Sequence, residues 1–99
     1  MPSLNVTAEA EADIDSIVEY TRITWGWRQA DRYLTKLEDG FDLLTRNPSL
    51  GRSCDAIQPG LRRFEIGSHV MFYRSEPGGL RVLRVLHQQM VPVKSRFES

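Results

Sequence analysis

The chain has 99 residues, of which 40% are apolar and 26% charged, and this size and composition indicate one soluble globular domain over residues 1–99. No window approaches about 18 uncharged apolar residues, and the N-terminus lacks the basic and then apolar run of a signal peptide, so the sequence excludes a membrane protein and favours a cytoplasmic one. Cys54 is the only cysteine, which excludes an internal disulfide and is typical of a reducing compartment.

The net charge of zero conceals a division between the two halves of the chain. Residues 1–50 have nine acidic and five basic side chains, a net charge of −4, whereas residues 51–99 have four acidic and eight basic ones, a net charge of +4. A basic half indicates an anionic partner, which can be nucleic acid, an acidic peptide or an acidic protein face. Arginines that only keep strand edges soluble produce the same pattern.

The first predicted elements are a short strand and a helix. Residues 4–6 alternate in polarity, which predicts a strand at the edge of a sheet. Thr7 has the position of a helix N-cap, and Glu9 and Glu11 follow in the first turn, where carboxylates complement the helix dipole. Apolar residues then recur at helical spacing, so we expect a helix over residues 8–24. Its buried face is predicted to comprise Ala10, Ile14, Ile17, Val18, Thr21 and Trp25.

A second helix follows at once, because Gly26 between two tryptophans is a helix stop that permits a tight reversal. Asn47-Pro48 ends this second helix. The two helices are expected to form an antiparallel hairpin across one face of a sheet. The apolar stripe of the second helix comprises Ala30, Tyr33, Leu34, Leu37, Phe41 and Leu44.

Residues 48–60 are rich in turn-forming types and predict a connector, which Leu50 and Ile57 are expected to attach to the body of the domain. The stretch 61–87 then predicts three strands with the sequences LRRFEI, HVMFYRS and LRVLRVLH. Gly67-Ser68 supplies a two-residue turn and residues 77–79 supply the second turn. The expected fold is α+β, with the order β-α-α-β-β-β and an antiparallel three-stranded meander.

Side-chain alternation assigns the strand residues to two faces. The last strand is apolar on both, with Leu83 and Val85 expected on one face and Val82 and Leu86 on the other. Because only two helices are available, either the C-terminal tail or another protein is expected to cover the second face. In the first two strands, one face is predicted to hold Phe64, Ile66, Met71 and Tyr73 and the other Arg63, Glu65, Val70, Phe72 and Arg74.

The sequence contains no motif for a metal site, a phosphate-binding loop or a catalytic nucleophile. His69 and His87 are the only histidines, and no HxxxH or CxxC spacing exists, so neither a metal nor a cofactor is expected. The glycines at 78 and 79 lie between two strands and do not open a helix, which excludes a phosphate-binding loop. No nucleophile-elbow motif is present. Cys54 is interpreted as a solvent-near or half-buried thiol without a role.

A basic and aromatic set on the meander remains as the candidate site. Arginine, histidine and tyrosine can hold an RNA backbone and move protons, as a metal-independent ribonuclease requires. However, strand alternation places Arg81 and His87 on one face of the last strand and Arg84 on the other, which opposes a single site. Each histidine can equally be a hydrogen-bonded structural residue near a strand end. The set comprises Arg62, Arg63, His69, Tyr73, Arg74, Arg81, Arg84 and His87.

The order of elements resembles the RelE/ParE superfamily of bacterial toxins, and specific strings resemble its ParE branch. Residues 12–17 resemble the start of its first helix, A-D-L-x-x-I, and residues 25–33 its link W-G-x-x-Q-A-x-x-Y. Leu61, where tyrosine is usual, and Val91, where aspartate is common, depart from the family pattern. The other matching strings are N-P-x-x-G-R at 47–52, G-Y-R-[RK] at 60–63, G-S-H-x-x-F-Y-R at 67–74 and [IV]-x-R-[IV]-L-H-x-x-M at 82–90.

The resemblance implies the toxin of a ParDE-type type II toxin–antitoxin system. ParE toxins are described as poisons of DNA gyrase and not as enzymes, so the expected partners are gyrase and a ParD-like antitoxin that folds on the toxin. Operator DNA is expected to be bound only through the antitoxin. A RelE-like ribonuclease is the alternative, although residues 88–90 offer no basic and aromatic cluster after the last strand. A degenerate toxin that acts only as an antitoxin-binding co-repressor is a further alternative.

No catalytic or metal-binding residue is predicted. The candidate residues for binding antitoxin or gyrase are those of the basic sheet and the segment that follows it, because charge-assisted arginine pairs are strong. A homodimer that buries the same face is the other interpretation of this surface. The candidates are Arg62, Arg63, Tyr73, Arg74, Arg81, Arg84, His87 and Met90.

Overall fold

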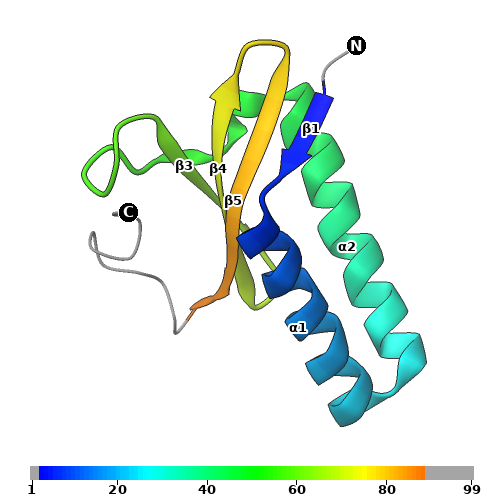
Figure 1. The fold of residues 1–99 in the computed structure, drawn as a ribbon. Coiled ribbons are helices and arrows are strands. Elements are labelled where there is room, and N and C mark those ends of the chain that lie inside the picture. The colour runs from blue at the N-terminus through cyan, green and yellow to red at the C-terminus, as the bar shows by residue number, and fades with distance from the viewer. Residues whose placement is uncertain (1–2, 89–99) are drawn as a thin grey trace.

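A helical hairpin packs on one face of a five-stranded sheet in the computed structural model, which describes residues 3–88 (Figure 1). The strand order is β1-β5-β4-β3-β2; β1 is parallel to β5 and the other neighbours are antiparallel. This confirms the expected β-α-α-β-β-β order and adds a two-residue strand, β2. The elements are β1 (Ser3–Val6), α1 (Ala8–Trp25), α2 (Trp27–Arg46), a short 3₁₀ helix (Pro48–Leu50), β2 (Arg52–Ser53), β3 (Leu61–Ile66), β4 (His69–Glu76) and β5 (Gly79–His87).

Helix α1 begins and ends at the predicted signals. The hydroxyl of Thr7 accepts a hydrogen bond of 3.1 Å from the backbone N–H of Ala10, which caps the helix. At the other end, Gly26 adopts φ 94°, a conformation that favours glycine, and starts α2 without a linker. The prediction that Trp25 is buried was wrong. The hairpin reaches beyond the end of the sheet, so the last turn of α1 has no sheet to pack against (Figure 1).

Helix α2 has the predicted apolar stripe, with Tyr33 and Leu34 half-buried and the other four residues buried. A fully buried leucine such as Leu37 contributes about 1.5–3 kcal/mol by leaving water. Gly40 is also buried, and a methyl group there would overlap the side chain of Ile66, so this glycine lets α2 approach β3 closely. The core between helices and sheet comprises Ala10, Ile17, Leu37, Phe41, Leu44, Ile66, Met71, Tyr73, Leu80, Val82 and Val85.

The second face of the sheet has its own apolar cluster, and the connector covers part of it. Ile57 packs against this cluster as predicted, and Cys54 is buried within it instead of half-buried. Leu50, the other predicted attachment point, is exposed. The C-terminal tail, named as a possible cover, lies outside the described residues. The cluster comprises Cys54, Leu61, Val70, Phe72 and Leu86, with Ile57 and Leu83 against it.

A β-bulge in β5 changes the faces of that strand. Tyr73 is the partner of Val82, but the preceding residue of β4, Phe72, is the partner of Arg84, so Leu83 is an extra residue. The bulge places Val82 on the helix side, where Val85 also packs.

The predicted alternation along β5 was therefore wrong. Leu83 and Leu86 both belong to the second face, and Val85 does not share a face with Leu83. The predicted common face of Arg81 and His87 was wrong for the same reason, because His87 lines a groove beneath α1.

The two turns of the meander agree with the prediction. Gly67 has φ 57° and Gly78 has φ 79°, values that residues other than glycine rarely adopt. Gly79, expected in the second turn, already belongs to β5. Within residues 3–88, neither helix is both long and apolar enough to cross a membrane.

Candidate functional site

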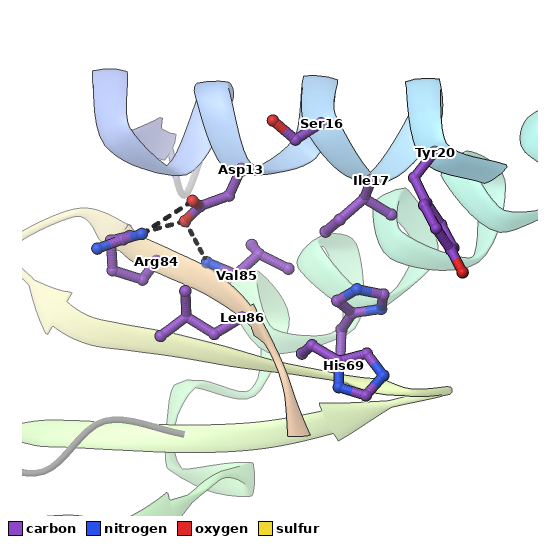
Figure 2. Close-up of a pocket in the computed structure, with 9 residues that line it drawn as sticks. Asp13, Ser16, Ile17, Tyr20, His69, Arg84, Val85 and Leu86 are labelled. Atoms are coloured by element: carbon purple, nitrogen blue, oxygen red, sulfur yellow. Dashed lines mark hydrogen bonds and ion pairs between the residues drawn. The ribbon is translucent and has the colours of Figure 1, made fainter. Parts of the chain in front are cut away.

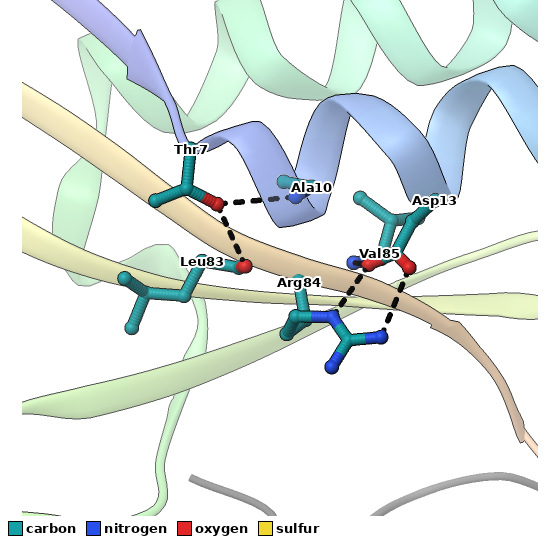
Figure 3. A network of polar contacts seen from close by, with 6 residues as sticks. All are labelled: Thr7, Ala10, Asp13, Leu83, Arg84 and Val85. Carbon is teal, nitrogen blue, oxygen red and sulfur yellow. Dashed lines mark hydrogen bonds and ion pairs between the residues drawn. The ribbon is translucent and has the colours of Figure 1, made fainter. Parts of the chain in front are cut away.

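Arg84, a predicted partner-binding residue, is joined to α1 (Figure 3). Its Nε and Nη2 atoms donate hydrogen bonds of 2.8 and 3.0 Å to the carboxylate of Asp13, which also accepts one of 3.0 Å from the backbone N–H of Val85. The hydrogen bond to Asp13 raises the pKa of Arg84 above its ordinary value. On the same strand, the hydroxyl of Thr7 donates to the carbonyl of Leu83 over 3.0 Å. Arg84 therefore holds α1 against β5.

Tyr73 and Arg62 hold the connector. Tyr73 is fully buried; its hydroxyl donates to the carbonyl of Pro48 over 2.7 Å and accepts from the backbone N–H of Gly51 over 2.8 Å. Burial raises the pKa of Tyr73. Arg62 donates from Nη1 to the carbonyls of Gly51 over 2.7 Å and Ser49 over 3.4 Å. Contrary to the expectation that it binds a partner, Tyr73 has no exposed surface for doing so.

Arg63 and Arg74 lie at the second apolar cluster. The guanidinium of Arg63 lies 5.8 Å from the centre of the Phe72 ring, and its Nη2 is 3.6 Å from a carboxylate oxygen of Glu65. Arg74 donates to the side-chain oxygen of Gln58 in the connector. In the part of the chain that the structure describes, the Nε atoms of Arg63 and Arg74 are buried and have no hydrogen-bond partner. Two buried donors on this face thus lack a hydrogen bond among the described residues.

Arg81 and His87, at opposite ends of β5, are the remaining described candidates. Arg81 is exposed and pairs with Glu76 over 3.3 Å, while its backbone neighbour across the sheet is Arg74. His87 is half-buried. Met90, the last predicted candidate, lies outside the described residues. The predicted set is therefore spread over both faces of the sheet and does not converge on one point.

A groove of about 440 Å³ separates α1 from the ends of β4 and β5 (Figure 2). In the close-up, Tyr20 and Ile17 descend from α1 toward His69. The hydroxyl of Tyr33 lies 2.5 Å from Nδ1 of His69, and the rings of His69 and His87 meet edge to face at 5.4 Å. The groove is lined by Asp13, Ser16, Ile17, Tyr20, His69, Arg84, Val85, Leu86 and His87.

The surroundings of His69 favour its neutral form. Burial is the main cause that lowers its pKa from 6.5, and the charge of the neighbouring His87 acts in the same direction. The bond to Tyr33 confirms the prediction of a hydrogen-bonded histidine at a strand end. Among residues 3–88, no three His, Cys, Asp or Glu side chains are grouped closely enough to hold a metal ion.

The end of the helical hairpin carries an apolar surface that the sequence interpretation missed. We call this surface the hairpin tip; its members are Tyr20, Ile23, Trp25 and Trp27, which are 68%, 69%, 72% and 67% exposed. The guanidinium of Arg22 lies 5.1 Å from the centre of the Trp27 ring. The sequence signal was the Trp-Gly-Trp string, which places two tryptophans at the predicted reversal.

Comparison with known proteins identifies the family to which this chain belongs. Residues 4–92 match the family described as ParE toxin of type II toxin-antitoxin system, parDE. The chain belongs to this family of toxins, as its sequence motifs predicted.

Individual relatives agree with this assignment. Toxin ParE1 of Mycobacterium tuberculosis is 44% identical over 82 residues, which cover 82% of this chain and 84% of the relative. Toxin ParE1 of Caulobacter vibrioides is 37% identical with coverages of 91% and 93%, and Toxin ParE of Escherichia coli is 35% identical with coverages of 91% and 88%. A solved chain of the chromosomal ParDE TA system from P. aeruginosa has the same fold, with a TM-score of 0.75, 23% identity and coverages of 88% and 96%.

Proposed function

We propose that this toxin inhibits DNA gyrase by binding it and that a ParD-like antitoxin neutralises it. The observation that carries the proposal is the family match over residues 4–92, because inhibition of gyrase and neutralisation by an antitoxin are what the ParE resemblance implies. The proposed consequence of free toxin is growth arrest.

The arrangement of the arginines favours binding over RNA cleavage. Phosphodiester cleavage needs preorganised donors that converge on the developing charge, together with a base of matched pKa. Here Arg84 is paired with α1, Arg62 with the start of the connector and Arg74 with its later part. Three guanidinium groups held by three different segments stabilise the fold, and this supports a toxin that acts through its surface.

We place the antitoxin on the second face of the sheet. Arg63 and Arg74 are half-buried beside the apolar cluster of that face, so part of each residue is accessible to a partner. An acidic antitoxin segment can supply carboxylates to the accessible part of these two arginines, since charge-assisted bonds are roughly twice as strong as neutral ones. Exposed Arg81, a neighbour of Arg74 across the sheet, extends the same basic surface.

The activity is tested with purified gyrase and with toxin released from its antitoxin complex. We expect supercoiling to fall or cleavage complexes to accumulate, and added antitoxin to restore activity. Prompt cleavage of mRNA by toxin that leaves supercoiling unchanged contradicts the proposal and favours a RelE-like ribonuclease.

The antitoxin surface is tested with the double variant Arg63→Gln/Arg74→Gln. We expect antitoxin affinity to fall by about tenfold or more, the usual effect of truncating a well-placed charged contact. The matched control is Arg46→Gln, which removes an exposed arginine of α2 on the helical side. Equal loss in both variants indicates a nonspecific effect of charge and contradicts the assignment.

A further inference from the structure

We propose that the hairpin tip is the surface with which this toxin enters an apolar cleft of gyrase, while the antitoxin occupies the sheet. The inference rests on the proposed function and assigns the target to one surface. Its starting point is the set of exposed apolar side chains near the free end of the α1–α2 hairpin, which extends beyond the sheet (Figure 1).

The exposed area at the tip is large for so small a domain. Aromatic side chains offer roughly 150–250 Å² each, so three of them at about two-thirds exposure present on the order of 400 Å². The largest apolar patch on a typical monomer is about 300–600 Å² and is often functional. Tyr20 and Ile23 lie one turn apart on α1, and Trp25 and Trp27 flank the glycine of the turn, so the four residues belong to the same end of the hairpin, where Tyr20 also lines the groove.

The backbone of the tip is held by hydrogen bonds at the turn. The N–H of Gly26 donates to the carbonyl of Arg22 over 2.8 Å and closes α1, and the N–H of Ala30 donates to the carbonyl of Gly26 over 3.1 Å and opens α2. Arg22 is paired with Glu19 and lies over the Trp27 ring, which ties α1 to the start of α2. Preorganisation lowers the entropy lost on binding. Tryptophan, tyrosine and arginine are also the residue types that dominate binding energy at interfaces.

The shape and the area of the hairpin tip favour a cleft on a larger protein as its binding site. Two copies that meet tip to tip bury about 400 Å² each, half of the roughly 800 Å² per partner that a stable interface needs. An antitoxin segment that folds on binding needs a long surface to recover its ordering entropy, and the sheet offers one whereas the tip does not. A protruding, rigid, aromatic end fits a concave apolar site, of the kind found between the domains of large enzymes.

The experiment compares the double variant Trp25→Ala/Trp27→Ala with Leu50→Ala. Leu50 is an exposed apolar residue of the 3₁₀ helix and not part of the tip, so it controls for the loss of surface apolarity. Each toxin is purified with its antitoxin, released, and measured in three assays: gyrase supercoiling, antitoxin affinity by calorimetry, and thermal melting of the complex by circular dichroism.

We expect the tip variant to need about tenfold or more toxin for half-inhibition of gyrase, as for loss of two hot-spot residues. Antitoxin affinity should stay within about twofold and the melting temperature should stay close to that of the wild type, because both side chains are exposed. Leu50→Ala should match the wild type in all three assays.

Three other results contradict the inference, and each points to a different cause. If the wild type inhibits gyrase and the tip variant is equally potent, the tip is not the gyrase surface, although the proposed function stands. If the tip variant loses antitoxin affinity and keeps its potency, the tip belongs to the antitoxin. If the wild type leaves gyrase unaffected, both the function and the inference fail.

A second variant covers the case in which the double substitution unfolds the hairpin. Ile23→Ser changes one exposed side chain of α1 and leaves both tryptophans and Gly26 in place. It should weaken gyrase inhibition while antitoxin affinity is retained. Full potency of this variant refutes the inference in that case.

Discussion

Replacing Asp13 by alanine tests whether one carboxylate joins α1 to β5. The substitution removes three hydrogen bonds, two from Arg84 and one from the backbone N–H of Val85. Bonds to charged groups contribute about 1.5–3 kcal/mol each, and an unpaired buried N–H costs about 1–3 kcal/mol. The Arg84 side chain is 32% exposed, so water recovers part of this loss. We expect the free energy of unfolding to fall by about 2–4 kcal/mol.

Thermal melting followed by circular dichroism measures this effect. Because a domain of this size loses about 4–8 °C per kcal/mol, Asp13→Ala should lower the melting temperature by roughly 10–25 °C. Asp13→Asn should have about half the effect, because an amide oxygen in the position of Oδ2 can still accept from Arg84 Nε and Val85 N–H. Asp15→Ala removes an exposed carboxylate of the same helix and is the matched control.

The double variant Asp13→Ala/Arg84→Met measures how much the interaction between these two side chains itself contributes to stability. Removing both charges leaves no uncompensated guanidinium, so the double variant should be more stable than Asp13→Ala alone. A melting temperature of Asp13→Ala within about 2 °C of the wild type, or simple additivity of the two substitutions, refutes the reasoning.

Three further outcomes are expected. Tyr73→Phe should lower the melting temperature by about 5–15 °C, since the carbonyl of Pro48 and the N–H of Gly51 lose their common partner; an unchanged value contradicts this anchoring role. Below pH 6.5, stability should fall with pH, because the unfolded chain binds a proton at His69 that the folded chain resists; the melting temperature of His69→Gln should lack this part of the pH dependence, and parallel curves refute it. Cys54 is buried and burial raises its pKa, so alkylation by iodoacetamide at pH 8 should be slow in folded toxin and fast in denaturant; equal rates exclude the buried position.

The helices could be predicted because their signals are local. The Thr7 cap, the apolar stripe of α2 and the glycine at the reversal each depend on residues within a few positions of one another. The exposure of Trp25 could not be predicted in this way. Helical periodicity identifies the face of a helix but not where the neighbouring sheet ends, and here the last turn of α1 extends past it.

The faces of β5 and the partners of the arginines depend on contacts between distant residues. β5 is apolar on both faces, so its composition does not reveal the extra residue that reverses the alternation after Val82. Likewise, Arg84 and Asp13 are 71 positions apart, and their pairing follows from the packing of α1 on the sheet. Charge patterning identified the basic half of the chain, but only the fold shows which arginines are already engaged within it.

The contacts of Thr7 and Asp13 also occupy the edge of β5 that β1 leaves unpaired. Strand β1 pairs with β5 only as far as Val82, and beyond that point an exposed strand edge is a template for aggregation. The hydroxyl of Thr7 donates to the carbonyl of Leu83, and the carboxylate of Asp13 accepts from the backbone N–H of Val85. These backbone groups of β5 are therefore not free to pair with the strand of another chain. A strand contributed by a partner therefore cannot pair with this part of β5 unless α1 is displaced, and the edge strands left for it are β1 and β2.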